Sequence, residues 1–269
     1  MLEALLHTAT SNMRIKLLTL NIEHGGKLFD NIVRLIEEQD PDIVLFQEVY
    51  DSNLQDRERR FRAFSEFGSI FKEKLPFKAF QSSCFFITEI DEGAEHGNCI
   101  YSKFEIKSNT KTELSVPYTI VDEKGTADYS IHPAITQNLE LIVDNQKLYV
   151  YNIHGVWGRD GLDSATRIEM AKRIASKIKG KTNVILAGDT NFTMDAKKTV
   201  QILEDAGVEN IFGETLISTF NMKYKNNPGY ATAAVDMIFT GKGIHIVEKE
   251  CLDADVSDHF PLTAIFELI

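Results

Sequence analysis

Apolar residues recur along this chain with two different spacings, and each spacing predicts a different kind of element. Between residues 27 and 39 the apolar side chains are three or four positions apart, which is typical of an amphipathic helix. Asp40-Pro41 ends this helix, because the residue before a proline is disfavoured in the helical conformation. Short apolar runs stand on either side, at 15–22 and 42–46. The N-terminal part therefore predicts a strand, a helix and a second strand.

The same two spacings continue through the rest of the chain. Helical spacing returns at 163–179 and 196–206, and also at 52–75, where charged and aromatic residues mix. Residues 105–133 show no regular spacing, and we expect them to contain loops. The remaining apolar runs predict short strands at 84–88, 98–101, 137–143, 147–153, 183–187, 235–240, 243–249 and 261–268.

The order of these elements predicts the fold class. Helices alternate with strands at first, whereas hairpins dominate later, with Asp144-Asn145 as one turn signal. This mixture favours an α/β fold of two mixed sheets packed face to face with helices outside, rather than a doubly wound parallel sheet. No linker, repeat or low-complexity tract divides the sequence. We therefore expect one domain over residues 13–269 after an N-terminal extension at 1–12.

Composition bears on the partners and the location of the protein. Hydrophobic residues make up 43% and charged residues 26% of the chain, as in ordinary globular proteins. The net charge of −11 argues against tight binding to long nucleic acid, which depends on neutralised phosphates. No run is long and apolar enough to predict a membrane span, and the N-terminus is a poor secretory signal. With three cysteines outside any metal-site spacing, we expect a cytoplasmic protein.

Unusual polar residues stand at the ends of the apolar runs. Side chains alternate along a strand, so Asn152 and His154 share a face, and so do Asp189 and Asn191. Carboxylates buried together are costly unless a cation or a partner compensates them. Six strands with such an end predict one shared site, made of Asn21, Gln47, Glu48, Asn152, His154, Asp189, Asn191, Asp236, Asp258 and His259.

The residue types at these ends indicate the chemistry. Glu48 and Asp258, with Asn21 as a neutral oxygen ligand, form an oxygen set without a thiolate, which suits Mg²⁺ or Mn²⁺ better than structural zinc. Hydrolysis of a phosphate ester requires stabilised charge on the phosphoryl oxygens, a neutralised leaving oxygen and an activated water. A metal ion, two histidines and a buried carboxylate can supply these needs.

Seven short motifs stand in order along the chain. They are LTLNIEHGG (18–26), DIVLFQEV (42–49), GNCIYSK (97–103), YNIHG (151–155), ILAGDTN (185–191), VDMIF (235–239) and SDHFPL (257–262). Each motif alone is weak, but the ordered set spans nearly the whole chain. The set resembles, in family order, the motifs of the endonuclease/exonuclease/phosphatase superfamily, which includes pancreatic deoxyribonuclease, apurinic endonucleases, neutral sphingomyelinases and inositol polyphosphate phosphatases.

The resemblance implies a four-layer α/β sandwich and a metal-dependent hydrolase of phosphate esters. Glu48 would be the main metal-ligating carboxylate, with Asn21 beside it and Asp258 completing or assisting the site. The first expectation for the reaction is a phosphodiesterase or nuclease acting on nucleic acid or a nucleotide-like substrate.

The resemblance also implies a role for each catalytic candidate. His259 would be the general base or a charge stabiliser near the attacking water, oriented by Asp236. His154 would hold a phosphate oxygen in the transition state. Asp189 would position or deprotonate the water, and Asn191 would fix that geometry and contact phosphate.

Further residues are expected to contact the substrate. Asn152, Trp157 and Arg159 are the candidates, since a loop aromatic and a guanidinium can bind a leaving group and phosphate. Glu23 and His24 follow Asn21 and are equally consistent with the site rim and with a plain turn.

Other readings remain open or are disfavoured. The run 257–259, Ser-Asp-His, does not predict a serine triad, because consecutive residues on an extended chain point in opposite directions.

The subfamily is not decided: Ala187 stands before Gly188 where inositol phosphatases have tryptophan, and Ala-Val-Asp-Met surrounds Asp236. A phosphatase, a phosphodiesterase of phospholipids or sugar phosphates, and a catalytically silent binding module therefore stay as alternatives.

Overall fold

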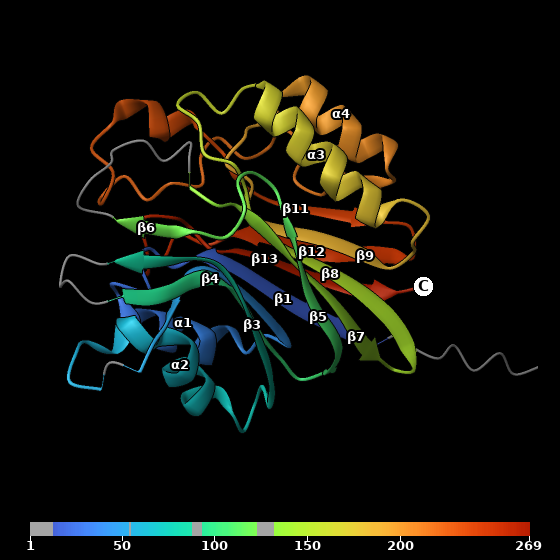
Figure 1. Ribbon diagram of the computed structural model, residues 1–269. Helices are drawn as coiled ribbons and strands as arrows, with labels where there is room; N and C mark the ends of the chain where they lie inside the picture. Colours follow the sequence, from blue (N-terminus) through green and yellow to red (C-terminus); the bar gives the residue numbers. More distant parts are fainter. Residues whose placement is uncertain (1–12, 54, 88–92, 123–131) are drawn as a thin grey trace, which may run out of the picture.

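The computed structural model describes residues 13–53, 55–87, 93–122 and 132–269. The extension expected at 1–12 lies outside the described residues. Two mixed sheets pack face to face, and helices cover the outer face of each sheet (Figure 1). This arrangement confirms the predicted α/β sandwich.

The first sheet has seven strands in the order β12-β13-β1-β2-β4-β3-β6. Its outer face is covered by α1 (Phe29–Gln39) and α2 (Ala63–Phe71), with a short 3-10 helix at Arg59–Arg62. The strands are β1 (Arg14–Asn21), β2 (Ile43–Asp51), β3 (Phe77–Ile87), β4 (Gly93–Ser102), β6 (Ile120–Asp122), β12 (Ile244–Cys251) and β13 (Leu262–Leu268).

The second sheet has six strands in the order β10-β11-β9-β8-β7-β5. Helices α3 (Ala165–Ile178) and α4 (Lys197–Asp205) cover its outer face, and a 3-10 helix at Pro228–Thr232 lies in the long connection before β11. The strands are β5 (Glu105–Glu113), β7 (Ile135–Val143), β8 (Gln146–His154), β9 (Val184–Asp189), β10 (Val208–Asn210) and β11 (Asp236–Gly241).

Alternation along the strands fills three apolar layers. In β1, Leu17 faces the core between the sheets, whereas Leu18 faces α1 and α2. In β9, Ile185 and Ala187 face the central core and Leu186 packs under α3 and α4. Because β1, β2, β8 and β9 are apolar on both faces, they read as continuous apolar runs in the sequence.

Strand directions bring the polar strand ends to one end of the sandwich. β1 and β2 run parallel, as do β8 and β9, so their carboxyl ends lie at the same edge. β11 and β13 run antiparallel to these strands, so their amino ends lie at that edge too. The register pairs Asn21 with Gln47, and Asp189 with both His154 and Asp236.

The structure refines two expectations about elements. Residues 114–119 form a loop as expected, but β5 and β6 lie on either side of it, and residues 123–131 lie outside the described residues. The sequence of β5, EIKSNTKTE, contains no apolar run that would predict a strand, because β5 is an edge strand with little buried surface. Within 52–75 the α-helix covers only Ala63–Phe71. In the described segments, no helix is long and apolar enough to cross a membrane.

Candidate active site

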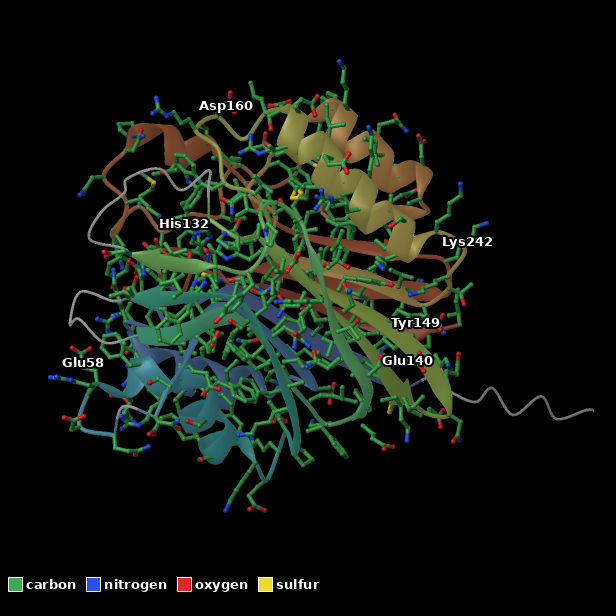
Figure 2. The ribbon with its side chains drawn as sticks, in the orientation of Figure 1. Glu58, His132, Glu140, Tyr149, Asp160 and Lys242 are labelled. Carbon is green, nitrogen blue, oxygen red and sulfur yellow. The ribbon has the colours of Figure 1, made fainter. Side chains whose placement is uncertain are left out.

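A pocket of about 540 Å³ opens at the end of the sandwich where the polar strand ends meet. Figure 2 marks this end by His132 and Asp160, which line the pocket, and the opposite end by Glu140, Tyr149 and Lys242. Both sheets contribute to the pocket wall, which includes the predicted Glu48, His154, Asp189, Asn191, Asp258 and His259.

A β-bulge places Glu48 in this pocket. The register between β2 and β4 shifts between Phe46 and Val49, so one extra residue stands opposite β4. Glu48 has a φ of 59°, a conformation that is uncommon outside glycine and that clusters at functional sites. Its Oε2 accepts the backbone N–H of His24 at 3.0 Å, and its Oε1 accepts Nδ2 of Asn21 at 2.9 Å.

The charge of Glu48 is favoured by its surroundings. Burial would raise its pKa, but the imidazoles of His24, His154 and His96 and the amide of His24 outweigh burial and hold the pKa well below the usual value. Glu48 is therefore an anion across the neutral pH range.

Asp189 lies at the centre of the site. Its Oδ2 accepts Nδ2 of Asn21 at 3.0 Å, and its Oδ1 accepts the backbone N–H of Asn191 at 2.9 Å. Asn191 is fixed in turn by donating Nδ2 to the carbonyl of Gly155 at 3.0 Å. Burial raises the pKa of the Asp189 carboxyl, and the charge of Asp236 adds to this effect while that of His259 opposes it. A raised pKa suits a carboxylate that exchanges a proton with water.

His259 and Asp236 form a hydrogen-bonded pair. Nδ1 of His259 donates to Oδ2 of Asp236 at 2.8 Å, and both side chains are buried. Burial alone would lower the pKa of His259, but Asp236 raises it to about 10, with further contributions from Asp258 and Asp189. The imidazolium is therefore the stable form at neutral pH. Of the two expected roles, charge stabiliser fits this protonation state better than general base.

His154 stands opposite this pair. Its Nε2 lies 3.7 Å from Oδ2 of Asp189 and 3.9 Å from Oε1 of Glu48, and a fifth of the side chain is exposed to the pocket. Nε2 of His259 approaches the same Oδ2 of Asp189 at 3.9 Å. Two imidazoles therefore flank one carboxylate, an arrangement that can surround a phosphoryl group.

Hard carboxylate oxygens offer the best place for a divalent cation. Ligand atoms of Asp189, Asp236 and His259 lie within 4.8 Å of one another. However, Nδ1 of His259 carries the proton that it donates to Asp236, so this nitrogen is not available to a metal. Glu48 and Asp258 remain as anionic oxygen donors in the pocket, and this set fits Mg²⁺ or Mn²⁺.

The side-chain amide of Asn21 does not present its oxygen to the carboxylates, as a metal ligand would. Its Nδ2 faces Glu48 and Asp189, while its Oδ1 accepts the backbone N–H of Glu23 at 3.1 Å. In this arrangement Asn21 positions the two carboxylates. Its expected part as an oxygen ligand stays a prediction, which requires the opposite amide orientation.

The expected substrate contacts fall in two places. Trp157 and Arg159 line the pocket, and so do Glu23 and His24. Asn152 does not line it. Its side chain is fully buried between the sheets, where Nδ2 donates to the carbonyls of Phe46 and Cys99. Oδ1 of Asn152 accepts a hydrogen bond from Gln47. Because a buried polar group needs such partners, its position supports a structural role in place of the expected contact with substrate.

Sequence reasoning missed several pocket residues, among them Lys225 and His96. Lys225 precedes the 3-10 helix at Pro228–Thr232, and its Nζ lies 2.5 Å from Oδ2 of Asp258. No spacing or strand end marks it in the sequence. His96 lies in β4, with its ring against Phe86 at 4.5 Å between centroids, and burial lowers its pKa to about 3. Its place directly before the GNCIYSK motif was the available signal.

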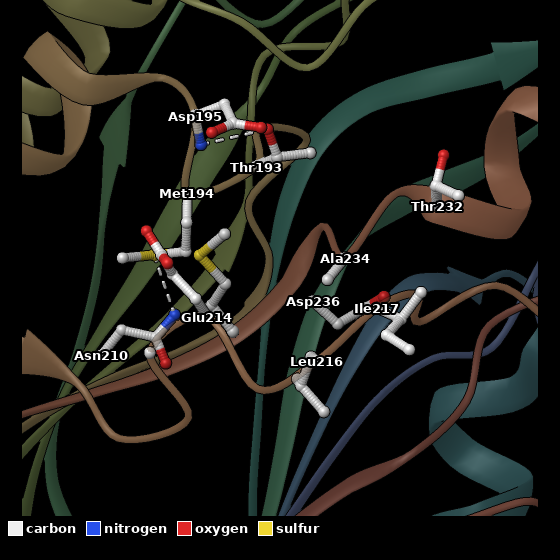
Figure 3. A pocket seen from close by; sticks show the side chains of 12 residues that line it. Thr193, Met194, Asp195, Asn210, Glu214, Leu216, Ile217, Thr232, Ala234 and Asp236 are labelled. Atoms are coloured by element: carbon white, nitrogen blue, oxygen red, sulfur yellow. Dashed lines mark hydrogen bonds between the residues drawn. The ribbon is translucent and has the colours of Figure 1, made fainter.

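A second cavity of about 270 Å³ lies behind Asp236, and Met194, Glu214 and Ile217 are among its lining residues (Figure 3). Oδ1 of Asp236 is buried and accepts no hydrogen bond from the described residues. The backbone N–H of Asp236 is held by Oγ1 of Thr219 at 3.1 Å. The bond to His259 is thus the main restraint on the Asp236 carboxylate.

The site residues coincide with the match to a known family. Residues 18–259 match the model of the Endonuclease/Exonuclease/phosphatase family. The chain belongs to this family. The matched span begins in β1 and ends at His259, so it contains every predicted catalytic and metal-ligating residue. A comparison with curated proteins finds no match.

Solved structures of the endonuclease/exonuclease/phosphatase family share the fold. A family protein from Beutenbergia cavernae has a TM-score of 0.76 at 12% identity, covering 95% of this chain and 72% of that one. A Bacteroides thetaiotaomicron mannosyl-6-phosphatase has a TM-score of 0.64 at 19% identity, covering 94% and 99%. D. rerio TDP2 complexed with single strand DNA product has a TM-score of 0.65 at 16% identity, covering 95% and 100%.

Proposed function

We propose that this protein is a divalent-metal-dependent phosphoesterase that acts in the pocket between the two sheets. The observation that carries the proposal is the meeting of Glu48, His154, Asp189, Asp258 and His259 in one pocket, with Asp236 hydrogen-bonded to His259 behind the pocket wall. Anions, imidazoles and a protonated histidine at such short range are what hydrolysis of a phosphate ester requires.

Glu48 and Asp258 would hold Mg²⁺ or Mn²⁺, which supplies charge stabilisation to the phosphoryl oxygens and the leaving oxygen when bound. The remaining steps belong to the side chains. His154 and the imidazolium of His259 donate hydrogen bonds to phosphoryl oxygens. Nε2 of each ring lies within 3.9 Å of the same atom, Oδ2 of Asp189, so both can face one phosphoryl group. Asp189 orients the attacking water and accepts its proton, and Asn191 holds Asp189 and contacts phosphate.

The substrate is a small or locally accessible phosphate ester. A pocket of about 540 Å³ accepts a group of nucleotide or sugar-phosphate size. The net charge of −11 disfavours a grip on many phosphates of a duplex. A phosphodiester or nucleotide-like substrate is our first assignment, supported by the likeness to TDP2 in complex with single strand DNA product.

A sugar phosphate is the second candidate. The pocket is lined by Phe86, Trp157 and Tyr230 together with imidazoles, and aromatic faces with polar neighbours suit a sugar ring as well as a base. The likeness to a mannosyl-6-phosphatase adds to this alternative.

The cytoplasmic location suggested by the cysteine content stays a prediction.

A hydrolysis panel tests the proposal. Protein with Mn²⁺ is offered a phosphodiester dye ester, a single-stranded oligonucleotide, duplex DNA, a 5′-tyrosyl oligonucleotide and hexose 6-phosphates. We expect turnover of at least one small ester, and weak binding of plain duplex that depends only slightly on salt concentration, because few phosphates are neutralised. His259→Ala is the matched inactive control. Failure to hydrolyse any phosphate ester would leave a silent binding module as the better assignment, and rapid cleavage of plain duplex would favour a general nuclease.

A further inference from the structure

Lys225 brings a positive charge to the carboxylates of the proposed metal site. Its Nζ contacts Oδ2 of Asp258 at 2.5 Å, and the charge of Glu48 also acts on it. Only 23% of the Lys225 side chain is exposed, compared with 9% for Asp258. The ammonium therefore compensates a buried carboxylate that would otherwise be costly.

Aromatic rings hold the lysine over the site. Nζ lies 5.1 Å from the ring centroid of Phe220 and 5.3 Å from that of Tyr230. The Phe220 ring also packs against His259, with 4.5 Å between their centroids. An isolated β-bridge pairs Phe220 with His259, and the backbone N–H of Asn221 donates to the carbonyl of Asp258. The segment that carries Lys225 is thus anchored to two site residues.

We propose that Lys225 is an internal counter-cation that neutralises Asp258 when no divalent cation is bound and contacts the substrate phosphate when one is. This inference rests on the proposed function, since it assumes a metal held by Glu48 and Asp258. It adds a residue that the sequence motifs do not contain.

Repulsion between cations is the reason why the Lys225 ammonium would have two positions, one with and one without the metal. A divalent cation on Asp258 repels an ammonium that already occupies Oδ2 of the same carboxylate, so the two cations compete for it. The lysine stem is flexible and ends in a compact charge, which lets the ammonium move a few ångströms without moving the backbone. A phosphate held by His154 and Asn191, as in the proposed function, would offer the ammonium another anion within the same pocket.

Lys223 provides a matched control two residues away. It also forms an ion pair with an aspartate, since its Nζ lies 2.5 Å from Oδ2 of Asp255. However, Lys223 is 67% exposed and is not among the pocket-lining residues. Lys225→Met and Lys223→Met remove the same charge from the same segment, but only the first removes it from the site.

Calorimetric titration tests both halves of the proposal. The first titration adds Mn²⁺ alone, and the second adds inorganic phosphate to the Mn²⁺-loaded protein. We expect Lys225→Met to bind Mn²⁺ about tenfold more tightly, equivalent to about 1.4 kcal/mol, because its competitor is gone. We expect it to bind phosphate about tenfold more weakly. Lys223→Met should match the wild type in both titrations, and Lys225→Arg should retain phosphate binding.

Each other outcome contradicts a definite part of the account. Unchanged or weaker Mn²⁺ binding by a folded Lys225→Met, with thermal unfolding as the check, would show that Lys225 does not compete with the metal. Tighter Mn²⁺ binding with unchanged phosphate binding would overturn the contact with substrate. If the wild type binds no Mn²⁺ while still hydrolysing phosphate esters, the metal assignment in the proposed function fails as well. If the wild type shows metal-dependent turnover and Lys225→Met matches it in both titrations, this inference alone would be overturned.

Discussion

At the scale of single residues, the site is organised by a few short hydrogen bonds before any substrate binds. Asn21 joins Glu48 to Asp189, and the pair of His259 and Asp236 joins a buried cation to a buried anion. Each bond restrains a side chain that would otherwise be free to rotate or to change its charge. Preorganised charge of this kind is usually the largest contribution to the catalysis of phosphoryl transfer.

The pairing of His259 with Asp236 predicts non-additive kinetics. Asp236→Asn and His259→Ala should each lower kcat by roughly 10²–10⁴-fold, and the double variant should be little worse than either. In an NMR titration, Asp236→Asn should also move the pKa of His259 from about 10 toward its ordinary value. Full additivity of the two effects in the logarithm of the rate would show that the residues act separately.

His96 predicts a loss of stability in acid. Burial holds its pKa at about 3, below the value of about 6.5 in an unfolded chain, so the unfolded chain binds this proton more readily. The stability that neutral His96 allows is complete above pH ~6.5 and is lost as the pH falls toward 3, by at most about 1.4 kcal/mol per pH unit.

Urea unfolding between pH 7 and 4 measures this effect. His96→Phe, which keeps a ring between Tyr50 and Phe86, should lose less stability than the wild type over this range. His245 lies exposed on β12, so His245→Phe should follow the wild type. Parallel curves for His96→Phe and the wild type would contradict the assignment of a buried neutral imidazole.

The sequence predicts the anionic and imidazole residues of the site better than their surroundings. Glu48, Asp189 and His259 stand directly after or before apolar runs, where a buried polar residue is conspicuous. Lys225 lies in a segment without regular spacing, so only the contact with Asp258 identifies it. Asn152 satisfies the same strand-end rule as His154, but bonds between the sheets bury it, and such pairings are invisible in a single sequence.

At the scale of elements, irregularities at strand ends aim the site residues. The bulge in β2 places Glu48 in the pocket. In β9, the positive φ of Gly188 sets the path of the backbone directly before Asp189. Gly188 has a φ of 136°, and a Cβ there would meet the carbonyl oxygen of Ile153 at 2.2 Å. A side chain at this position would force the parallel β8 and β9 apart beside Asp189.

Two glycine substitutions separate backbone strain from this clash. Gly180 also has a positive φ, of 81°, but nothing lies within 4 Å of a Cβ there. Gly180→Ala should therefore cost only about 1 kcal/mol, whereas Gly188→Ala should cost more and lower activity. Chemical unfolding and kcat measure the two effects. Equal destabilisation, or full activity in Gly188→Ala, would contradict the role given to the close approach.

The sequence also predicts elements unevenly, for a physical reason. Strands buried on both faces, such as β1, β2 and β9, appear as apolar runs of the right length. The edge strand β5 lacks that signal because its pairing with β7 is made by backbone hydrogen bonds that any sequence can form. The strand order of each sheet depends on contacts far apart in the chain, and the pattern predicts only that two mixed sheets exist.

At the scale of the whole molecule, the site exists only where the two sheets meet. The first sheet brings Asn21 and Glu48, and the second brings His154, Asp189 and Asp236. The chain carries a net charge of −11, and the proposed substrate is an anion too. A cation bound in the pocket would lower the repulsion between them, so substrate binding as well as chemistry favours the proposed metal dependence.

The rate of phosphodiester hydrolysis before and after metal removal tests this claim most directly. EDTA-treated protein should be inactive and should recover with Mg²⁺ or Mn²⁺. Glu48→Ala should need far more metal, whereas His259→Ala should bind Mn²⁺ nearly as well as the wild type and turn over at least a hundredfold more slowly, within the range of about 10²–10⁴ for such groups. EDTA-treated protein that hydrolyses the ester as fast as the Mg²⁺ form would contradict the account.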